Sequence, residues 1–394
     1  MTSAPDLDSP ALDSPALHSP ALHSPAPDEP DLGGPDLGVP VLDVRSLDTV
    51  LHTPDGRALH VLHGVSLTIA AGECLGVVGE SGSGKSVLAR AVLGVESRTT
   101  RAVATGEIRL NGEDLLAASR TRRAELLGTG IAMVHQDPMT SLNPVVRIAD
   151  QVTESLTNRR RLSRRERLRT ATELLAAVDV PDPARRARAH PHELSGGLRQ
   201  RVGIAAALAG EPALLLADEP TTALDVTVQR TVLDLLDQHR RSRGLATLLI
   251  THDIGLLYGR ARRIAVMYGG RIVETGPTEA VTRHPRHPYT AALLRSVPRV
   301  TGPLRRTLPA IPGSPPDLTR PTPGCPFAPR CELATDLCTT TAPPTHTAAD
   351  GHTATCHFPL TAPSDAPSSS HSSSPSPSPD SSPDSSPDEL EPAA

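Results

Sequence analysis

Apolar positions recur along the chain in two patterns, and each predicts a different kind of strand. Residues 41–50 and 59–69 alternate between apolar and polar side chains, which is typical of half-buried antiparallel strands. The segment Thr53-Pro54-Asp55-Gly56 between them has the composition of a turn. Later runs are apolar almost throughout and indicate buried strands: Leu75–Val78, Ile131–His135, Ala213–Ala217 and Thr247–Thr251.

Two further segments add to this pattern. Residues 106–112 are expected to form another strand, at the edge of a sheet, that ends in a turn. From about residue 148 to residue 208 the apolar spacing becomes helical. The succession of strands and helices predicts an α/β fold.

A phosphate-binding loop follows the strand at residues 75–78. The pattern is G-x-x-x-x-G-K-[ST], made by Gly79, Glu80, Ser81, Gly82, Ser83, Gly84, Lys85 and Ser86, and a helix-forming segment comes next. Glycines let backbone N–H groups turn towards an anion, and the helix start adds its positive end. Lys85 is expected to reach the β- and γ-phosphates of a nucleotide, and Ser86 to hold Mg²⁺. A simple glycine-serine turn would not explain the flanking strand and helix.

Lysine usage supports this interpretation. Among the 39 basic residues of the chain, Lys85 is the single lysine and all others are arginines. A compact ammonium group differs from a planar guanidinium in the way that it contacts phosphate. The one position that keeps lysine is therefore expected to need it.

Polar residues follow three of the other apolar runs: Gln136, the pair Asp218 and Glu219, and His252. A polar side chain at such a strand end can face the γ-phosphate. Asp218 is placed to hold Mg²⁺, and Glu219 to polarise an attacking water. Each also has an alternative interpretation without a catalytic role. Gln136 could be a solvated loop residue, Asp218 and Glu219 could cap a helix, and His252 could be structural.

A second glycine-rich helix start occurs at Ser195-Gly196-Gly197, before an alanine-rich helix. A serine cap followed by two glycines offers backbone N–H groups to an anion. Because the chain has a single lysine-bearing loop, this second terminus is expected to serve the nucleotide of another protomer. Taken alone, such a cap is common.

Composition limits the classes of function. The chain has 394 residues with 41 prolines and 38% hydrophobic content, and residues 1–40 and 361–394 are low in complexity, so we expect both ends to be disordered. The formal charge is −5 and aromatic residues make up 1%, which argues against nucleic acid as a partner. The basic stretch at residues 158–170 is expected to be the solvated face of a helix. No apolar run is long enough to span a bilayer and no signal peptide is evident, so a cytoplasmic location is expected.

Four of the five cysteines lie late in the chain, at Cys325, Cys331, Cys338 and Cys356. Their C-x5-C-x6-C-x17-C spacing falls in a proline-containing segment with little apolar content, which needs a covalent or metal link to fold. The paired C-x-x-C spacing typical of zinc is absent. Four irregularly spaced thiols fit a [4Fe–4S] cluster at least as well, so iron–sulfur is expected first and zinc second.

In their order and spacing these motifs resemble those of the ATP-binding subunits of ABC transporters. The correspondence covers residues 41 to about 283. It comprises the Walker A loop at 79–86, the Q-loop glutamine Gln136, the signature at 194–197, the Walker B run that ends at Asp218 with Glu219 beside it, the D-loop at Ala223-Leu224-Asp225, and the switch histidine His252. A set of six motifs is far more specific than a phosphate-binding loop alone.

A narrower resemblance is to the dipeptide and oligopeptide importers, a branch that includes nickel importers. It rests on residues 136–144, on Asp225-Val226-Thr227-Val228-Gln229, and on the later segment His287-Pro288-Tyr289. The resemblance implies an ATPase that powers peptide uptake, or uptake of nickel or another small solute. A soluble ABC ATPase without a transport role is a further alternative, but such proteins usually join two cassettes in one chain.

The family resemblance also implies an architecture: a P-loop α/β domain at 41–283 with an antiparallel β subdomain and an inserted helical subdomain at about 137–208. An importer-type extension with the four cysteines would follow at 284–360. The implied partners are a second, different ATPase subunit, two membrane permeases and an extracytoplasmic solute-binding protein, with this chain at the cytoplasmic face of the membrane. Nucleic acid is not expected.

Residue roles follow from the same resemblance. The nucleotide would be bound by Leu51, Gly79, Glu80, Ser81, Gly82, Ser83, Gly84, Lys85, Ser86, Gln136, Ser195, Gly196, Gly197 and Asp218. Catalysis would involve Lys85, Gln136, Glu219 and His252, and the Mg²⁺ ligands would be Ser86, Gln136 and Asp218. Two positions depart from the family pattern. Leu51, followed by His52, stands where an aromatic side chain usually stacks on adenine, and Leu198 replaces a glutamine or methionine after the signature.

Overall fold

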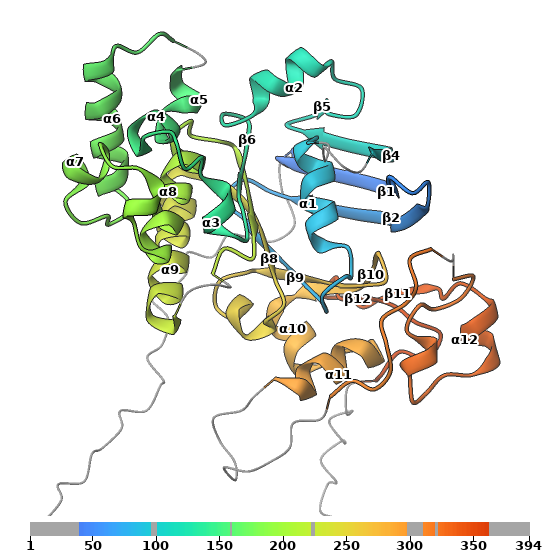
Figure 1. Ribbon diagram of the computed structural model, residues 1–394. Coiled ribbons are helices and arrows are strands. Elements are labelled where there is room, and N and C mark those ends of the chain that lie inside the picture. The colour runs from blue at the N-terminus through green and yellow to red at the C-terminus, as the bar shows by residue number, and fades with distance from the viewer. Residues whose placement is uncertain are drawn as a thin grey trace, which may run out of the picture. The chain divides into compact units, whose positions relative to one another are not determined.

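The computed structural model describes residues 39–95, 101–157, 160–221, 225–297, 310–319 and 322–361. The segments expected to be disordered, residues 1–40 and 361–394, lie outside the described residues except for positions 39, 40 and 361. Within the described residues the strands form two sheets, one fully antiparallel and one mostly parallel (Figure 1). The α/β class expected from the alternating pattern is confirmed.

The antiparallel sheet has the strand order β2-β1-β4-β5. Its strands are β1 (Leu42–His52), β2 (Ala58–Ile69), β4 (Arg101–Leu110) and β5 (Glu113–Asp114). The two alternating segments therefore form the predicted antiparallel pair, joined by the predicted turn. The prediction of an edge strand at residues 106–112 is wrong in one respect, because β4 lies between β1 and the short β5. A two-residue strand is too short to be recognised from an apolar pattern.

The second sheet has the order β11-β12-β10-β9-β3-β8-β7-β6. Its parallel part consists of β3 (Cys74–Val78), β6 (Ile131–Val134), β7 (Leu214–Asp218), β8 (Ala246–Thr251) and β9 (Arg263–Tyr268). The antiparallel strands β10 (Arg271–Pro277), β12 (Thr353–Thr355) and β11 (Thr345–Thr347) continue it at one side. Every residue of β3, β7 and β8 is buried, as their continuous apolar sequences predict.

Several helices follow β6 and form the expected helical region. They are α3 (Pro138–Ser141), α4 (Ile148–Val152), α5 (Glu154–Thr157), α6 (Arg164–Ala176), α7 (Pro183–Arg186), the 3₁₀ turn η1 (Pro191–Glu193) and α8 (Gly196–Leu208). Helix α6 begins with a capping box, in which Ser163 accepts a hydrogen bond from the N–H of Glu166 and the Glu166 carboxylate accepts one from the N–H of Ser163. Arg164, Arg165 and Glu166 in its first turn are exposed, as expected for this part of the basic stretch at residues 158–170, whereas Arg167 is partly buried.

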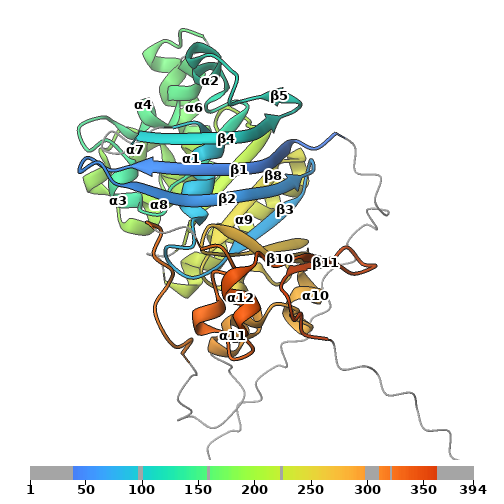
Figure 2. The same ribbon diagram turned by 90° about the vertical axis from the view of Figure 1, so that its right-hand side faces the viewer.

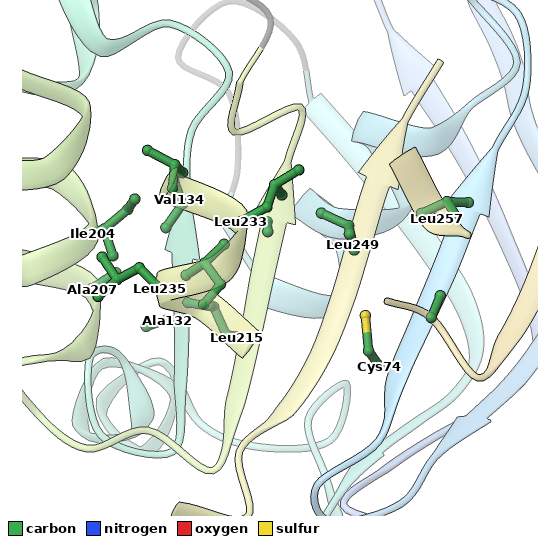
Figure 3. Packing of buried hydrophobic residues seen from close by; sticks show 14 of the residues in the cluster. Cys74, Ala132, Val134, Ile204, Ala207, Leu215, Leu233, Leu235, Leu249 and Leu257 are labelled. Carbon is green, nitrogen blue, oxygen red and sulfur yellow. The ribbon is translucent and has the colours of Figure 1, made fainter. Parts of the chain in front are cut away.

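The apolar core has two parts, one on each face of the central sheet. Neighbouring residues of β7 alternate between them: Leu215 and Ala217 contribute to the part under α8 and α9 (Val226–Arg243), whereas Leu214 and Leu216 contribute to the other. Figure 3 shows the first part, with Ile204 and Ala207 of α8 facing the strands. The second part surrounds α1 (Lys85–Leu93), which lies beside the antiparallel sheet in both views (Figures 1 and 2).

The C-terminal segment comprises α10 (Thr278–Arg283), α11 (Pro288–Ser296), η3 (Ala328–Arg330), α12 (Asp336–Thr340) and the hairpin β11–β12. The hairpin extends the central sheet through Thr275 of β10, which pairs with Thr353. The remaining described elements are α2 (Arg120–Leu126) and η2 (Ile254–Leu257). Within the described ranges, we find no helix with the length and apolar character that crossing a membrane requires.

Candidate nucleotide site

The Walker A loop connects β3 to α1 and has a backbone that requires glycine. Gly82 and Gly84 have φ angles of 81° and 103°, in the left-handed region that side chains disfavour. A Cβ at Gly79 would clash with the carbonyl oxygen of Met267. Gly84 is the N-cap of α1. Because glycine has no side chain to cap the helix, the first N–H groups of α1 are available to a ligand.

Lys85 is 5% exposed and points into this loop. Its Nζ donates hydrogen bonds to the carbonyl oxygens of Gly79 at 2.8 Å and Glu80 at 2.9 Å. Burial lowers the pKa of the ammonium from its usual value, while nearby carboxylates, foremost that of Glu219, oppose the shift. The ammonium is thus held by two backbone carbonyl oxygens of the loop, which a bound phosphate could replace as its partners.

The predicted Mg²⁺ ligands Ser86 and Asp218 lie together. The Ser86 hydroxyl donates to Asp218 Oδ1 at 3.0 Å, although the two residues are 132 positions apart in the chain. Asp218 is 3% exposed, and burial raises the pKa of its carboxyl group. An oxygen pair from a hydroxyl and a carboxylate is the donor set that Mg²⁺ uses beside nucleotide phosphates.

The three remaining strand-end residues converge on one carboxylate. Gln136 Nε2 donates to Glu219 Oε2 at 3.0 Å, and His252 Nδ1 lies 3.2 Å from the same oxygen. They meet because β6, β7 and β8 are parallel neighbours whose carboxyl ends share one edge of the sheet. Glu219 has a φ of 47°, a left-handed conformation that costs on the order of 1 kcal/mol for a residue other than glycine.

Ser195 lies at a different helix start, that of α8. Its side chain accepts a hydrogen bond from the Leu198 N–H at 3.4 Å, as expected for an N-cap. Ser195 and Gly196 are exposed, and a Cβ at Gly196 would meet nothing within 4 Å. The hydrogen bonds found for Ser195 in the described part of the chain stay within the turn that starts α8. Among the described residues, no hydrogen bond therefore joins Ser195 to the Walker A loop of the same chain.

Of the other predicted positions, the structure describes those in β1 and the last residue of the expected D-loop. Leu51 is half-buried in β1, opposite Leu59, and His52 after it is exposed. Asp225 caps α9 by accepting a hydrogen bond from the N–H of Val228 at 3.0 Å. Ala223 and Leu224 of the expected D-loop lie outside the described residues.

Two residues next to the Walker A loop were not predicted. The Tyr289 hydroxyl accepts a hydrogen bond from the Glu80 N–H at 2.8 Å, and Arg330 donates to both carboxylate oxygens of Glu80, at 2.6 and 3.0 Å. Tyr289 belongs to the His-Pro-Tyr segment that the sequence does mark, but nothing there indicates its contact. Arg330 stands between two cysteines, and no local pattern distinguishes it from the other arginines.

The four late cysteines line one pocket together with apolar side chains that include Phe327, Leu333 and Phe358. None forms a disulfide, and burial raises the pKa of Cys325 to about 11. The Phe358 N–H donates to Cys356 Sγ at 3.4 Å. Among the residues that the structure describes, however, no three His, Cys, Asp or Glu side chains are grouped closely enough to hold a metal ion. Four thiols in one pocket are chemically suited to bind a metal ion or an iron–sulfur cluster. In the described structure, however, they lie too far apart to act as ligands of one metal ion.

The loop, the Ser86–Asp218 pair and the carboxylate beside it define a P-loop nucleoside triphosphatase. Residues 62–222 match the family described as ABC transporter, and residues 273–338 match the oligopeptide/dipeptide transporter C-terminal region. The chain belongs to the ABC transporter family of ATP-binding proteins, in the group that carries this C-terminal region, and it is an ATPase of the ABC type.

Individual relatives agree with this assignment. The chain is 45% identical over 322 residues to a putative peptide import ATP-binding protein of Brucella melitensis, covering 79% of this chain and 95% of the relative. It is 44% identical over 296 residues to the dipeptide transport ATP-binding protein DppD of Escherichia coli, covering 75% of this chain and 90% of DppD. A similar solved structure is a dimeric ATP-binding cassette in a post-hydrolysis state bound to ADP and Pi, with a TM-score of 0.53, 26% identity, and coverage of 60% of this chain and 98% of that one.

Proposed function

We propose that this chain is the ATP-hydrolysing subunit of an importer that takes up dipeptides or oligopeptides through partner permease subunits in the membrane. The observation that carries the ATPase part is the Glu219 carboxylate, which contacts Gln136 and His252 close to the Ser86–Asp218 pair. The peptide part is supported by the C-terminal region at 273–338 and by relatives named as peptide import proteins.

Each residue at the strand ends has a proposed role. Lys85 and the loop amides hold the β- and γ-phosphates, and Ser86, Asp218 and Gln136 hold Mg²⁺, which offsets the negative charge on the phosphates. Glu219 accepts a proton from the attacking water as general base. His252 and Gln136 contact the γ-phosphate, so that its loss alters their contacts with Glu219. Leu51 packs against the adenine.

The signature turn acts on the nucleotide of a second ATPase subunit. Support comes from the exposure of Ser195 and Gly196 and from the hydrogen bonds of Ser195, which leave a helix N-terminus open to a ligand from outside the chain. The dimeric state named for the similar solved cassette is consistent with this arrangement. We propose that the partner is a different ATPase chain, so that the working unit is a heterodimer.

The permeases are proposed to contact the helical region. Met139 and Val145, which follow the Q-loop glutamine, are exposed by 61% and 80%, and such apolar side chains suit a protein interface. This contact would place the chain at the cytoplasmic face of the membrane, while a solute-binding protein delivers peptide from the other side. The proposed domain boundaries are 41–283 for the ATPase domain, with helices at 137–208, and 284–360 for the extension.

Reconstitution with the two permeases and the solute-binding protein in liposomes tests this function. We expect dipeptides or oligopeptides, added outside, to stimulate ATP hydrolysis and to accumulate inside. Stimulation by nickel salts but not by peptides would instead assign the nickel importer alternative. ATP hydrolysis that no permease or solute alters would favour a role outside transport.

We further propose that Cys325, Cys331, Cys338 and Cys356 hold a [4Fe–4S] cluster, with zinc as the alternative. The support is that four thiols line one pocket with an apolar surround, and that an N–H group already donates to one sulfur. Binding would require the thiols to approach one another and to lose their protons. Protein purified without oxygen should be brown with about four irons per chain. A colourless protein with one zinc per chain would assign zinc, and a metal-free one would refute both.

A further inference from the structure

A buried arginine from the cysteine-bearing segment is tied to the Walker A loop. The Arg330 side chain is 4% exposed, and Glu80, with a side chain 25% exposed, is its ion-pair partner. Two parallel N–H···O bonds of 2.6 and 3.0 Å join the guanidinium to the two oxygens of the Glu80 carboxylate. This forked geometry is the strongest and most directional pairing available to the two groups.

Every N–H donor of the guanidinium is used. Besides Glu80, Arg330 donates to the Tyr268 hydroxyl at 3.1 Å, to the Pro312 carbonyl at 2.7 Å and to the Ile311 carbonyl at 3.1 Å. Its charged carbon also lies 5.7 Å from the centre of the Tyr268 ring. Since an arginine has five such donors, the guanidinium has no freedom to reorient without losing a bond.

The same region also holds the backbone of Glu80. The Tyr289 hydroxyl accepts a hydrogen bond from the Glu80 N–H at 2.8 Å, and the Tyr289 ring packs at 4.5 Å, centre to centre, from that of Tyr268. Glu80 is therefore fixed at its amide and at its carboxylate by residues more than 200 positions later in the chain. Its carbonyl oxygen, in turn, accepts from Lys85 Nζ.

These contacts affect nucleotide binding because the ligand of the loop, a triphosphate, is negatively charged. A carboxylate within a phosphate-binding loop repels a triphosphate, and partial burial strengthens that repulsion. Arg330 pairs with both oxygens of the Glu80 carboxylate and so offsets its negative charge. A loop that is already ordered also binds a ligand more tightly, because less conformational freedom is lost on binding.

We infer that Arg330 is a positioning residue for the Walker A loop, which sets the affinity for ATP by neutralising and fixing Glu80. The inference rests on the proposed function only in that the loop binds ATP. Because η3 carries Arg330 directly before Cys331, the fold of the cysteine segment is thereby linked to the nucleotide site.

The test compares the affinity of full-length variants for a fluorescent, non-hydrolysable ATP analogue, with the thermal unfolding midpoint measured in parallel. Arg330→Gln should weaken binding by on the order of tenfold, since it leaves an unpaired carboxylate in the loop. Glu80→Gln alone should weaken it less, by about threefold, through loss of the anchor. In the double variant the neutral amide no longer repels phosphate, so binding should recover to within about threefold of the unmodified chain. Arg295→Gln, an exposed arginine of α11, is the matched control and should change neither quantity.

If the affinity for the ATP analogue recovers in the double variant, Arg330 acts through the charge of Glu80. If Arg330 only anchored the cysteine-bearing segment, the affinity would not recover. Equal weakening in Arg330→Gln and in the double variant, or unchanged affinity in Arg330→Gln, would overturn the inference. If Arg330→Gln does not fold, Arg330→Lys replaces it; about threefold weaker binding supports the inference, and unaltered binding overturns it. An unmodified chain that binds no ATP analogue would instead refute the proposed function, so the two failures are distinguishable.

Discussion

The chain has two glycine-rich helix starts with the same backbone chemistry but opposite surroundings. The Walker A start at Lys85 is enclosed: Lys85 is 5% exposed, Ser86 bonds Asp218, and Glu80 is fixed by Tyr289 and Arg330. The signature start at Ser195 is exposed and is stabilised by a bond to its own helix. One start is thus an enclosed binding site, whereas the other is an exposed helix N-terminus.

This difference suggests how the work is divided between subunits. Enclosure supplies affinity, because the residues that meet the phosphates are already ordered. On the proposed function, exposure would supply control, because the open helix start would contribute only when a second subunit brings a nucleotide to it. Changes at the Walker A start should therefore alter ATP binding by a single chain, whereas changes at the signature start should leave that binding unchanged and alter turnover by paired chains.

The largest expected effect comes from the carboxylate between Gln136 and His252. Glu219→Gln keeps the shape of the side chain and both contacts but cannot accept a proton, so turnover should fall by about 10²–10⁴-fold. ATP binding should persist, and the trapped nucleotide should hold the Walker A start of one subunit against the signature start of the other. Steady-state ATPase assays and gel filtration with ATP measure these two results; an unaltered rate would remove Glu219 from the role of base.

A change at the enclosed start comes next in size. Lys85→Arg keeps the positive charge, but a planar guanidinium does not fit the space between the carbonyl oxygens of Gly79 and Glu80, which accept from Nζ at 2.8 and 2.9 Å. We expect ATP binding by the single chain to weaken by about 10- to 100-fold, roughly 1.4–2.8 kcal/mol, in equilibrium titrations. Binding within twofold of the unmodified chain would show that charge alone suffices at this position.

Much of this contrast could be predicted from the sequence, for a physical reason. Parallel strands place their carboxyl ends at one edge of the sheet, and the sequence predicts a polar residue at the end of three such strands. The structure brings these residues, Gln136, Glu219 and His252, together. The strands of three residues at Thr345 and Thr353 were not predicted, because segments so short carry no period. The Arg330–Glu80 pair spans 250 residues, and local patterns contain no information about such partners.

The smallest of these effects is expected at the exposed start. Ser195→Ala removes the side-chain oxygen that accepts the Leu198 N–H, which should lower the free energy of unfolding by about 1 kcal/mol. The single chain should still bind ATP with unchanged affinity, since Ser195 bonds only within its own turn among the described residues. Turnover by the assembled transporter should fall by about tenfold, as expected when one hydrogen bond to a phosphate is lost. Parallel titration and turnover assays decide the matter: weakened binding in the single chain would mean that both helix starts serve one nucleotide in one subunit, and the division of labour between enclosed and exposed starts would have to be abandoned.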